Sequence, residues 1–358
     1  MLSTDRNINL ISKQIKIFNV KNVIVTNKES YEIIKKKFNK IKVFQNFDNI
    51  DKITRNKVDY TMSAISGFDG LKPTLKIIKK TKRIAIANKE SIICGWELIN
   101  KELKKQKTEF IPVDSEHFSI WSIIKNYNIL EIEKIILTAS GGPFLNKKIK
   151  INTKPIDAAK HPNWKMGKKI SIDSATLMNK VFEVIEAKKM FNIELNKFEI
   201  LIHPKSYIHA IVKLKNGLIK IIAHETDMKI PIYNSIYIGD RIQKYFSSKK
   251  INLKTLNSLN LQKVKKKKFP VINILNKIPN KNSLYDTVLV AVNDELVDLF
   301  LKNKINFLDI SSKVCRFLNL PFFTKFKLQK PKNLAQIEKL NQFVRLKTRT
   351  LSVISEKK

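Results

Sequence analysis

The chain has 358 residues, of which 43% are hydrophobic, and this suffices for two or three domains with a buried core rather than a disordered tail. Lysine and arginine outnumber aspartate and glutamate by 69 to 31, which gives a formal charge of +38. No stretch approaches the roughly 18 apolar residues of a membrane-spanning helix, the first residues lack a secretory signal pattern, and two cysteines cannot build a disulfide framework. We therefore expect a cytoplasmic protein of enzyme size.

The excess of basic residues has two interpretations, a nucleic-acid partner or a solvated coat of lysines. Only seven of the 69 basic residues are arginines, the residue that nucleic-acid readers use for bidentate contacts. The sequence has no helix-turn-helix signature, no zinc-finger spacing and no aromatic RNA-binding strand. We favour the solvated coat, and a salt-sensitive shift of RNA would support the nucleic-acid alternative.

The first part of the chain alternates strand and helix patterns, which is typical of a parallel α/β sheet. We expect helices over 8–18, 29–39 and 73–80, strands over 20–26, 59–65 and 83–87, and a turn over 67–70.

From Pro112 onward the strands are separated by longer polar loops. We expect strands over 134–138, 170–172, 198–202, 210–213 and 218–223, a helix from about 175 to 191, and further helices over 283–302, 307–318 and 333–355. The predicted fold is α/β plus α+β. Its segments are an α/β domain (1–111), a central α+β domain (112–240), a lysine-rich connector (241–268) and a C-terminal α-helical domain (269–358).

Two carboxylates stand close together in the segment PVDSEH (112–117). Asp114 and Glu116 are two residues apart, and in an extended segment side chains at this spacing point the same way. Two carboxylate oxygens on one face suit Mg²⁺ or Mn²⁺. Taken alone, a segment of this kind is more often a surface pair without a ligand.

Further polar residues follow downstream. Asp173 or Ser174 is expected to cap the next helix and so direct backbone N–H groups toward an anion. Asn179 and Glu183 are four residues apart and share one face of that helix. Lys180, which stands beside them, is a candidate phosphate ligand rather than one more solvated lysine.

Two other positions precede this helix. Ser140 and two glycines follow a predicted strand, where the backbone can approach a ligand closely. His161 is isolated in a polar loop, and its default interpretation is a surface histidine.

Five segments carry a resemblance that runs in order along the chain. They are ANKESIICG (87–95), PVDSEH (112–117), LTASGGPF (137–144), AAKHPNWKMGKKISIDSATLMNKVFEVIEA (158–187) and IHPKSYIHAIV (202–212). The segment AVNDELVDLFL (291–301) continues it. Together they resemble the 1-deoxy-D-xylulose 5-phosphate reductoisomerase family. The resemblance implies conversion of this sugar phosphate to 2-C-methyl-D-erythritol 4-phosphate in non-mevalonate isoprenoid biosynthesis, with NADPH, a Mn²⁺ or Mg²⁺ ion, and a homodimer. It also implies that residues 1–111 are an incomplete Rossmann-like NADPH-binding domain and that residues 112–240 are the catalytic domain that binds metal and substrate.

The resemblance also implies roles for individual residues. The implied metal ligands are Asp114, Glu116 and Glu183. The implied substrate contacts are Lys89, Ser115, Glu116, Ser140, His161, Ser174, Asn179, Lys180 and Glu183, of which Lys89, Glu116 and His161 would be catalytic. The implied NADPH contacts are Asp5, Arg6, Asn7, Asn88, Glu90 and Gly167. Trp164 and Met166 would lie on a lid over the site. Because unpaired carboxylates repel one another, we expect some of the pKa values of the metal ligands to be raised.

The chain departs from the family pattern at several places. A glycine of the helix is replaced by Val181, the motif HPQS reads HPKS (203–206), the turn 67–70 carries larger residues, and a Gly and a Pro before Asp-Met are replaced in the segment HETDM (224–228).

The largest departure concerns glycine. The chain has eight glycines and none precedes Gly67, so residues 1–66 cannot form the glycine-rich turn that holds a dinucleotide pyrophosphate. We therefore expect weak NADPH binding, an exposed sheet edge at residues 20–26 and their neighbours, and a natural protein that starts about 30 residues further upstream. The alternative function is a truncated or decayed member that binds metal and sugar phosphate without efficient turnover.

Overall fold

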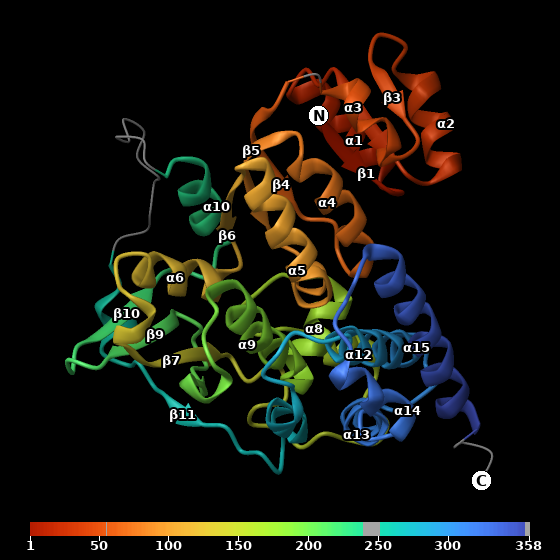
Figure 1. Ribbon diagram of the computed structural model, residues 1–358. Helices are drawn as coiled ribbons and strands as arrows, with labels where there is room; N and C mark the ends of the chain where they lie inside the picture. The colour runs from red at the N-terminus through yellow and green to blue at the C-terminus, as the bar shows by residue number, and fades with distance from the viewer. Residues whose placement is uncertain (55, 239–250, 355–358) are drawn as a thin grey trace.

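The computed structural model describes residues 1–54, 56–238 and 251–354, and in chain order it has an α/β part, a part built on a mixed sheet, and a helical part (Figure 1). This architecture confirms the expected fold class. None of the helices in the described residues combines the length and the hydropathy that a membrane-spanning segment needs.

The α/β part contains two three-stranded parallel sheets. The strands of the first are β1 (Leu2–Thr4), β2 (Asn22–Val25) and β3 (Lys42–Phe44), and those of the second are β4 (Val58–Ser63), β5 (Thr81–Ile86) and β6 (Glu109–Pro112). The helices of this part are α1 (Ile8–Ile17), α2 (Lys28–Lys37), α3 (Ile50–Ile53), α4 (Leu71–Ile78) and α5 (Lys89–Gln106). The alternation of strands and helices that the sequence predicts is confirmed here.

The exposed edge that we expected at residues 20–26 and their neighbours falls on the strands next to β2, and β2 itself is not an edge. It lies between β1 and β3 and pairs with both. Val23, Ile24 and Val25 are fully buried, and a strand that is apolar on both faces favours a central position. Among the described strands, the edges of this sheet are β1 and β3.

The mixed sheet forms the floor of the central part. Its strand order is β10-β9-β7-β8-β11, in which only the pair β7–β8 is parallel. The strands are β7 (Ile132–Ala139), β8 (Phe198–Ile202), β9 (Ile208–Leu214), β10 (Ile219–Ala223) and β11 (Gln262–Lys263). The helices of this part are α6 (Ser115–Ile124), α7 (Pro155–Ala158), α8 (Lys168–Thr176), α9 (Met178–Phe191), α10 (Lys229–Ile236) and α11 (Leu253–Leu256).

The segment from 168 to 177 differs from its prediction. The strand expected over 170–172 is wrong, because these residues belong to helix α8. Ile172 and Ala175 are both fully buried, and their spacing of three is helical. Leu177, in a left-handed conformation with φ of 64°, separates α8 from α9. Asp173 and Ser174 therefore lie inside α8. The expectation that one of them caps the following helix is wrong.

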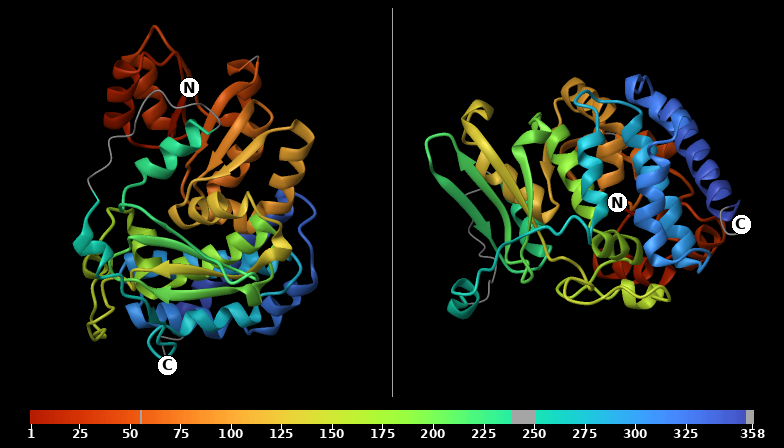
Figure 2. Two further views of the ribbon diagram at one scale, coloured as in Figure 1. Left: turned by 90° about the vertical axis from the view of Figure 1, so that its left-hand side faces the viewer. Right: turned by 90° about the horizontal axis from the view of Figure 1, so that it is seen from below.

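The C-terminal part is helical, as predicted. Its helices are α12 (Tyr285–Leu301), α13 (Phe307–Phe317), α14 (Pro321–Thr324) and α15 (Leu334–Ile354). Helix α12 is buried along nearly its whole length and contacts α5, α8, α13 and α15. The mixed sheet and these helices lie on opposite sides of α8 and α9 (Figure 2). Residues 241–250 of the expected connector lie outside the described residues, and the rest contains α11 and β11.

Candidate active site

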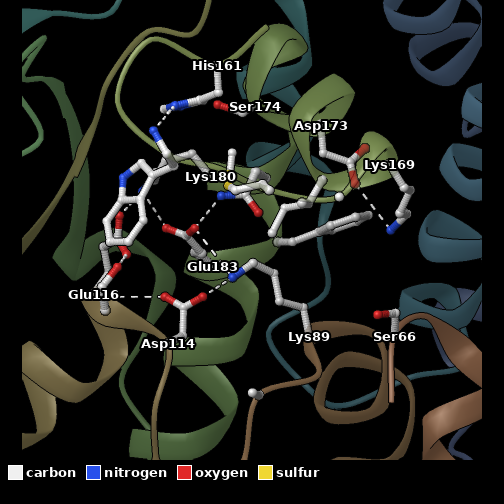
Figure 3. A pocket seen from close by; sticks show the side chains of 18 of the residues that line it. Ser66, Lys89, Asp114, Glu116, His161, Lys169, Asp173, Ser174, Lys180 and Glu183 are labelled. Atoms are coloured by element: carbon white, nitrogen blue, oxygen red, sulfur yellow. Dashed lines mark hydrogen bonds and ion pairs between the residues drawn. The ribbon is translucent and has the colours of Figure 1, made fainter. Parts of the chain in front are cut away.

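A cavity of roughly 530 Å³ lies between the second parallel sheet and the central part. It is lined by the start of α5, the start of α6, the end of β7, the loop before α8, and the helices α8 and α9. Figure 3 shows a cluster of carboxylates and Lys89 at one end of this cavity and His161 with Ser174 at the other.

Three carboxylates converge at the first end. One oxygen each of Asp114, Glu116 and Glu183 lies within 4.8 Å of the other two. The reason differs from the one we inferred from the sequence, because residues 114–116 are not extended. Asp114 is the N-cap of α6 and Glu116 lies in its first turn, while Glu183 comes from α9. The two helices bring the carboxylates together.

Two lysines lie among these carboxylates. Lys89 donates a hydrogen bond to Asp114, and its amino nitrogen is 3.5 Å from an oxygen of Glu183. The amino nitrogen of Lys180 is 2.7 Å from Glu116 Oε1 and 2.5 Å from Glu183 Oε2. Both lysines are buried or nearly so, and the two positive charges compensate most of the negative charge of the cluster.

The expectation that some carboxylate pKa values are raised is confirmed at Glu183. Burial and the neighbouring Glu116 raise the pKa of Glu183 to about 7. Burial also works to raise the pKa values of Asp114 and Glu116, but Lys89 and Lys180 respectively outweigh it and hold them below their ordinary values. These two carboxylates do not share the rise in pKa, because a lysine lies against each.

His161 is not the isolated surface histidine of the default interpretation. Its Nδ1 accepts the backbone N–H groups of Asn163 (3.1 Å) and Trp164 (2.9 Å). Burial lowers the pKa of His161 to about 4, so the ring is neutral at pH 7 and carries its one proton on Nε2. That nitrogen lies 2.9 Å from Ser140 Oγ, which also accepts the N–H of Gly142. The hydroxyl proton of Ser140 is thereby left to donate to a ligand.

The other expected substrate contacts surround the same cavity. Ser115 donates to Glu116, and Asn179 donates to Glu183 at the predicted i, i+4 spacing. The buried Oδ1 of Asn179 has no hydrogen-bond partner among the described residues. Ser174 is buried and lines the cavity.

The expected NADPH contacts divide into two groups. Asn88, Glu90 and Gly167 line the cavity, although the amide of Asn88 already donates to the carbonyls of Ile65 and Gly67 and accepts from the N–H of Ser91. Asp5, Arg6 and Asn7 do not line it, and they lie in the loop after β1. Asn7 caps α1, Asp5 accepts a hydrogen bond from Thr26, and the side chain of Arg6 is 80% exposed.

Sequence reasoning missed a charged group in the wall of the cavity. Lys169 on α8 donates to Glu90, and its amino nitrogen lies 3.2 Å from Asp173 and 2.9 Å from Asp294. These acids come from α5, α8 and α12, so one lysine joins all three parts of the chain. Asn293 completes the group by donating to Asp173 at 2.8 Å. The only available signal was the presence of Lys169 and Asp294 in segments that carry the family resemblance.

Comparisons with known proteins cover nearly the whole chain. Residues 1–95 match the family model for 1-deoxy-D-xylulose 5-phosphate reductoisomerase, and residues 110–191 and 224–347 match two models for C-terminal domains of the same enzyme. The enzyme of this name from Pelagibacter ubique is 58% identical, over 99% of this chain and 92% of the relative. The enzyme from Caldanaerobacter subterraneus is 40% identical, over 85% of this chain and 80% of the relative.

Solved structures agree with these matches. The reductoisomerase from Zymomonas mobilis in complex with NADPH has 30% identity and a TM-score of 0.85, over 98% of this chain and 91% of that one. A reductoisomerase in complex with NADPH, fosmidomycin and magnesium has 28% identity and a TM-score of 0.90, over 99% and 91%. The chain belongs to the 1-deoxy-D-xylulose 5-phosphate reductoisomerase family.

Proposed function

We propose that this cavity converts 1-deoxy-D-xylulose 5-phosphate to 2-C-methyl-D-erythritol 4-phosphate, with NADPH as the reductant. The observation that carries the proposal is the convergence of Asp114, Glu116 and Glu183, with one oxygen of each within 4.8 Å of the others. The test is the decrease in NADPH absorbance when the purified chain receives the sugar phosphate and Mg²⁺. A chelator should stop this decrease, and addition of Mg²⁺ should restore it.

Asp114, Glu116 and Glu183 would hold the divalent metal ion. Three carboxylates offer the oxygen ligands that Mg²⁺ and Mn²⁺ prefer, and the unpaired Oδ1 of Asn179 is a buried acceptor beside them. A bound divalent ion would polarise the substrate carbonyl and stabilise negative charge on its oxygen. Lys89 and Lys180 keep Asp114 and Glu116 ionised, which is the state that binds metal.

The opposite end of the cavity fits the substrate phosphate. Ser140, whose oxygen accepts from the neutral His161, presents its O–H as a donor, and Ser174 adds a hydroxyl group. Separating the phosphate end from the carboxylate end orients the sugar between them (Figure 3). Trp164 and Met166 line the cavity from the loop before α8, so closing this loop would exclude water from the substrate.

NADPH would lie with its nicotinamide end near Asn88, Glu90 and Gly167. The exposed guanidinium of Arg6, in the loop after β1, is a suitable partner for a phosphate of the cofactor. Weak NADPH binding stays a prediction, because residues 1–66 contain no glycine. Direct titration of the chain with NADPH tests it, and tight binding would show that another phosphate site replaces the glycine-rich turn.

A homodimer is supported by the outer strand of the mixed sheet. Among the described strands, β10 forms one edge, and Leu218, Ile219 and Ile221 on or beside it are half exposed or more. Apolar side chains at a sheet edge favour pairing with a second copy. Sedimentation should give twice the mass of the chain, and Ile219→Lys should shift it toward the monomer, whereas Lys148→Ala, at an exposed position, should not.

The domain boundaries given above and a cytoplasmic location also stay proposals. The division at residue 112 is supported by the end of β6 at Pro112. A reducing compartment is supported by Cys94 and Cys315, which are both free.

A further inference from the structure

Two histidine rings are stacked on each other beside the loop that carries Trp164. The rings of His209 on β9 and His224, which follows β10, have centroids 3.8 Å apart and planes inclined by 18°. The two strands are antiparallel neighbours (Figure 1), and their pairing ends where Ala223 meets Ile208. The end of this ladder therefore places the two histidines against each other.

Backbone carbonyls fix the orientation of both rings. His209 Nε2 lies 3.2 Å from the carbonyl oxygen of His224, and His224 Nδ1 lies 2.7 Å from that of Glu225. Because a carbonyl oxygen only accepts, each of these nitrogens carries the ring proton. Burial lowers the pKa of His209 to about 4 and also lowers the pKa of His224, so two neutral rings stack without charge repulsion at pH 7.

The stack continues to the loop over the cavity. The indole of Trp164 meets the His209 ring edge to face, with centroids 6.1 Å apart and planes inclined by 69°. The neighbouring Asn163 anchors the same loop by donating to the Pro204 carbonyl at 2.6 Å and to Ser206 Oγ at 2.8 Å. Trp164 itself lines the cavity, so it lies between the cavity and the pair of histidines.

We propose that His224 is a positioning residue for the substrate loop, which it supports by stacking on His209 and so holding Trp164 over the cavity. This inference rests on the proposed function and deepens it. His224 is not among the described residues that line the cavity, so it acts through its neighbours and not on substrate. The segment 224–228 is also one of the places where the chain departs from the family pattern.

The experiment tests whether the ring of His224 is needed to support the loop. Replacing it by Gly removes the stacking partner of His209, whereas replacing it by Phe keeps a flat ring and removes only the nitrogen atoms. Lys215→Ala, at an exposed position in the turn between β9 and β10, is the control. The emission of Trp164 is obtained by subtracting the spectrum of the Trp164→Phe variant, which retains Trp96 and Trp121.

We expect His224→Gly to shift the Trp164 emission to longer wavelength and to increase its quenching by acrylamide. The dissociation constant of fosmidomycin, measured with Mg²⁺ present, should rise about tenfold, which is about 1.4 kcal/mol. KM should rise by a similar factor. The value of kcat should stay within about twofold of the parent, because His224 touches no reacting atom. His224→Phe should restore both, and the control should match the parent. Unchanged Trp164 emission in a folded His224→Gly variant would overturn the proposal, and so would a His224→Phe variant that behaves like His224→Gly. If His224→Gly does not fold, His224→Gln replaces it with the same expected results.

The emission readout separates this proposal from the proposed function. A parent chain that neither binds fosmidomycin nor turns over the sugar phosphate would contradict the proposed function. The Trp164 emission would still report whether His224 supports the loop.

Discussion

The amino nitrogen of Lys180 lies 2.7 Å from Glu116 Oε1, and only 5% of the lysine side chain is exposed. A buried cation therefore occupies the space beside a carboxylate that is expected to bind metal. A divalent ion entering this cluster would compete with Lys180 for the same oxygens, and the lysine would then be available to an anionic substrate.

We expect Lys180→Ala to have opposite effects on two ligands. Loss of a charge-assisted contact, worth about 1.5–3 kcal/mol, should weaken fosmidomycin binding roughly tenfold or more. Loss of the competing cation should strengthen Mn²⁺ binding by the substrate-free protein, measured at a pH high enough to keep Glu116 and Glu183 ionised without the lysine. Calorimetric titration of both ligands checks this, with the exposed Lys148→Ala as control. Unchanged affinity for both fosmidomycin and Mn²⁺ would show that Lys180 has only a structural role.

Glu116→Gln is expected to abolish turnover at ordinary metal concentrations. The substitution keeps the size of the side chain but removes one of three anionic ligands, so metal binding should weaken by at least tenfold. Glu133→Gln is a matched control, because Glu133 is exposed and its only ion pair within the described part of the chain is with Lys213. Near-normal activity of the Glu116 variant at low Mn²⁺ would show that the metal ligands are assigned wrongly.

The raised pKa of Glu183 predicts how the metal-free protein responds to pH. Its pKa is about 7 in the folded chain against an ordinary value of 4.5. A raised carboxyl pKa stabilises the fold fully below the ordinary value, and this stability is lost as the pH rises through 7. Metal binding needs the ionised form, so metal affinity should increase over the same interval.

Thermal unfolding with a chelator measures the first effect. Between about pH 5 and 8 the melting temperature of the parent should fall relative to that of Glu183→Gln, which cannot ionise. If the melting temperatures of the two proteins changed in parallel with pH, Glu183 would titrate outside this pH interval.

Lys169→Met is expected to destabilise the fold. The variant leaves Glu90, Asp173 and Asp294 close together without their shared cation, and breaking such a buried group costs about 3–5 kcal/mol. Urea unfolding measures the loss, and Lys168→Met, its exposed neighbour, should change the free energy of unfolding by less than about 0.5 kcal/mol. Equal stability of both variants would contradict the structural role of Lys169.

Local sequence patterns were sufficient for elements whose side chains repeat regularly. The strand over 198–202 has the predicted bounds, and Asn179 and Glu183 share a helix face as their spacing requires. The pattern failed over 168–176, where Ile170 and Ile172 alternate with polar residues as they would in a strand. Burial of this segment against α12 favours the helix instead, and that contact lies more than 100 residues away in the chain.

The same limit applies to the site. The family resemblance indicated that Asp114, Glu116 and Glu183 share one metal site. It could not show that Lys89 and Lys180 lie among these carboxylates and lower the pKa values of two of them. The link between Lys169 and Asp294 also depends on how separate parts of the chain pack. Charge compensation of this kind is set by tertiary distances, which no local pattern contains.

The proposed function is tested most directly by identifying the product that residues 1–358 form from 1-deoxy-D-xylulose 5-phosphate. The assay uses saturating Mg²⁺ and saturating NADPH, so that weak cofactor binding does not hide turnover, and NADPH that carries deuterium at the transferred position. Mass spectrometry should find 2-C-methyl-D-erythritol 4-phosphate with one deuterium, formed by the parent and not by Glu116→Gln. Recovery of unchanged substrate from a folded, metal-loaded parent would contradict the proposed function.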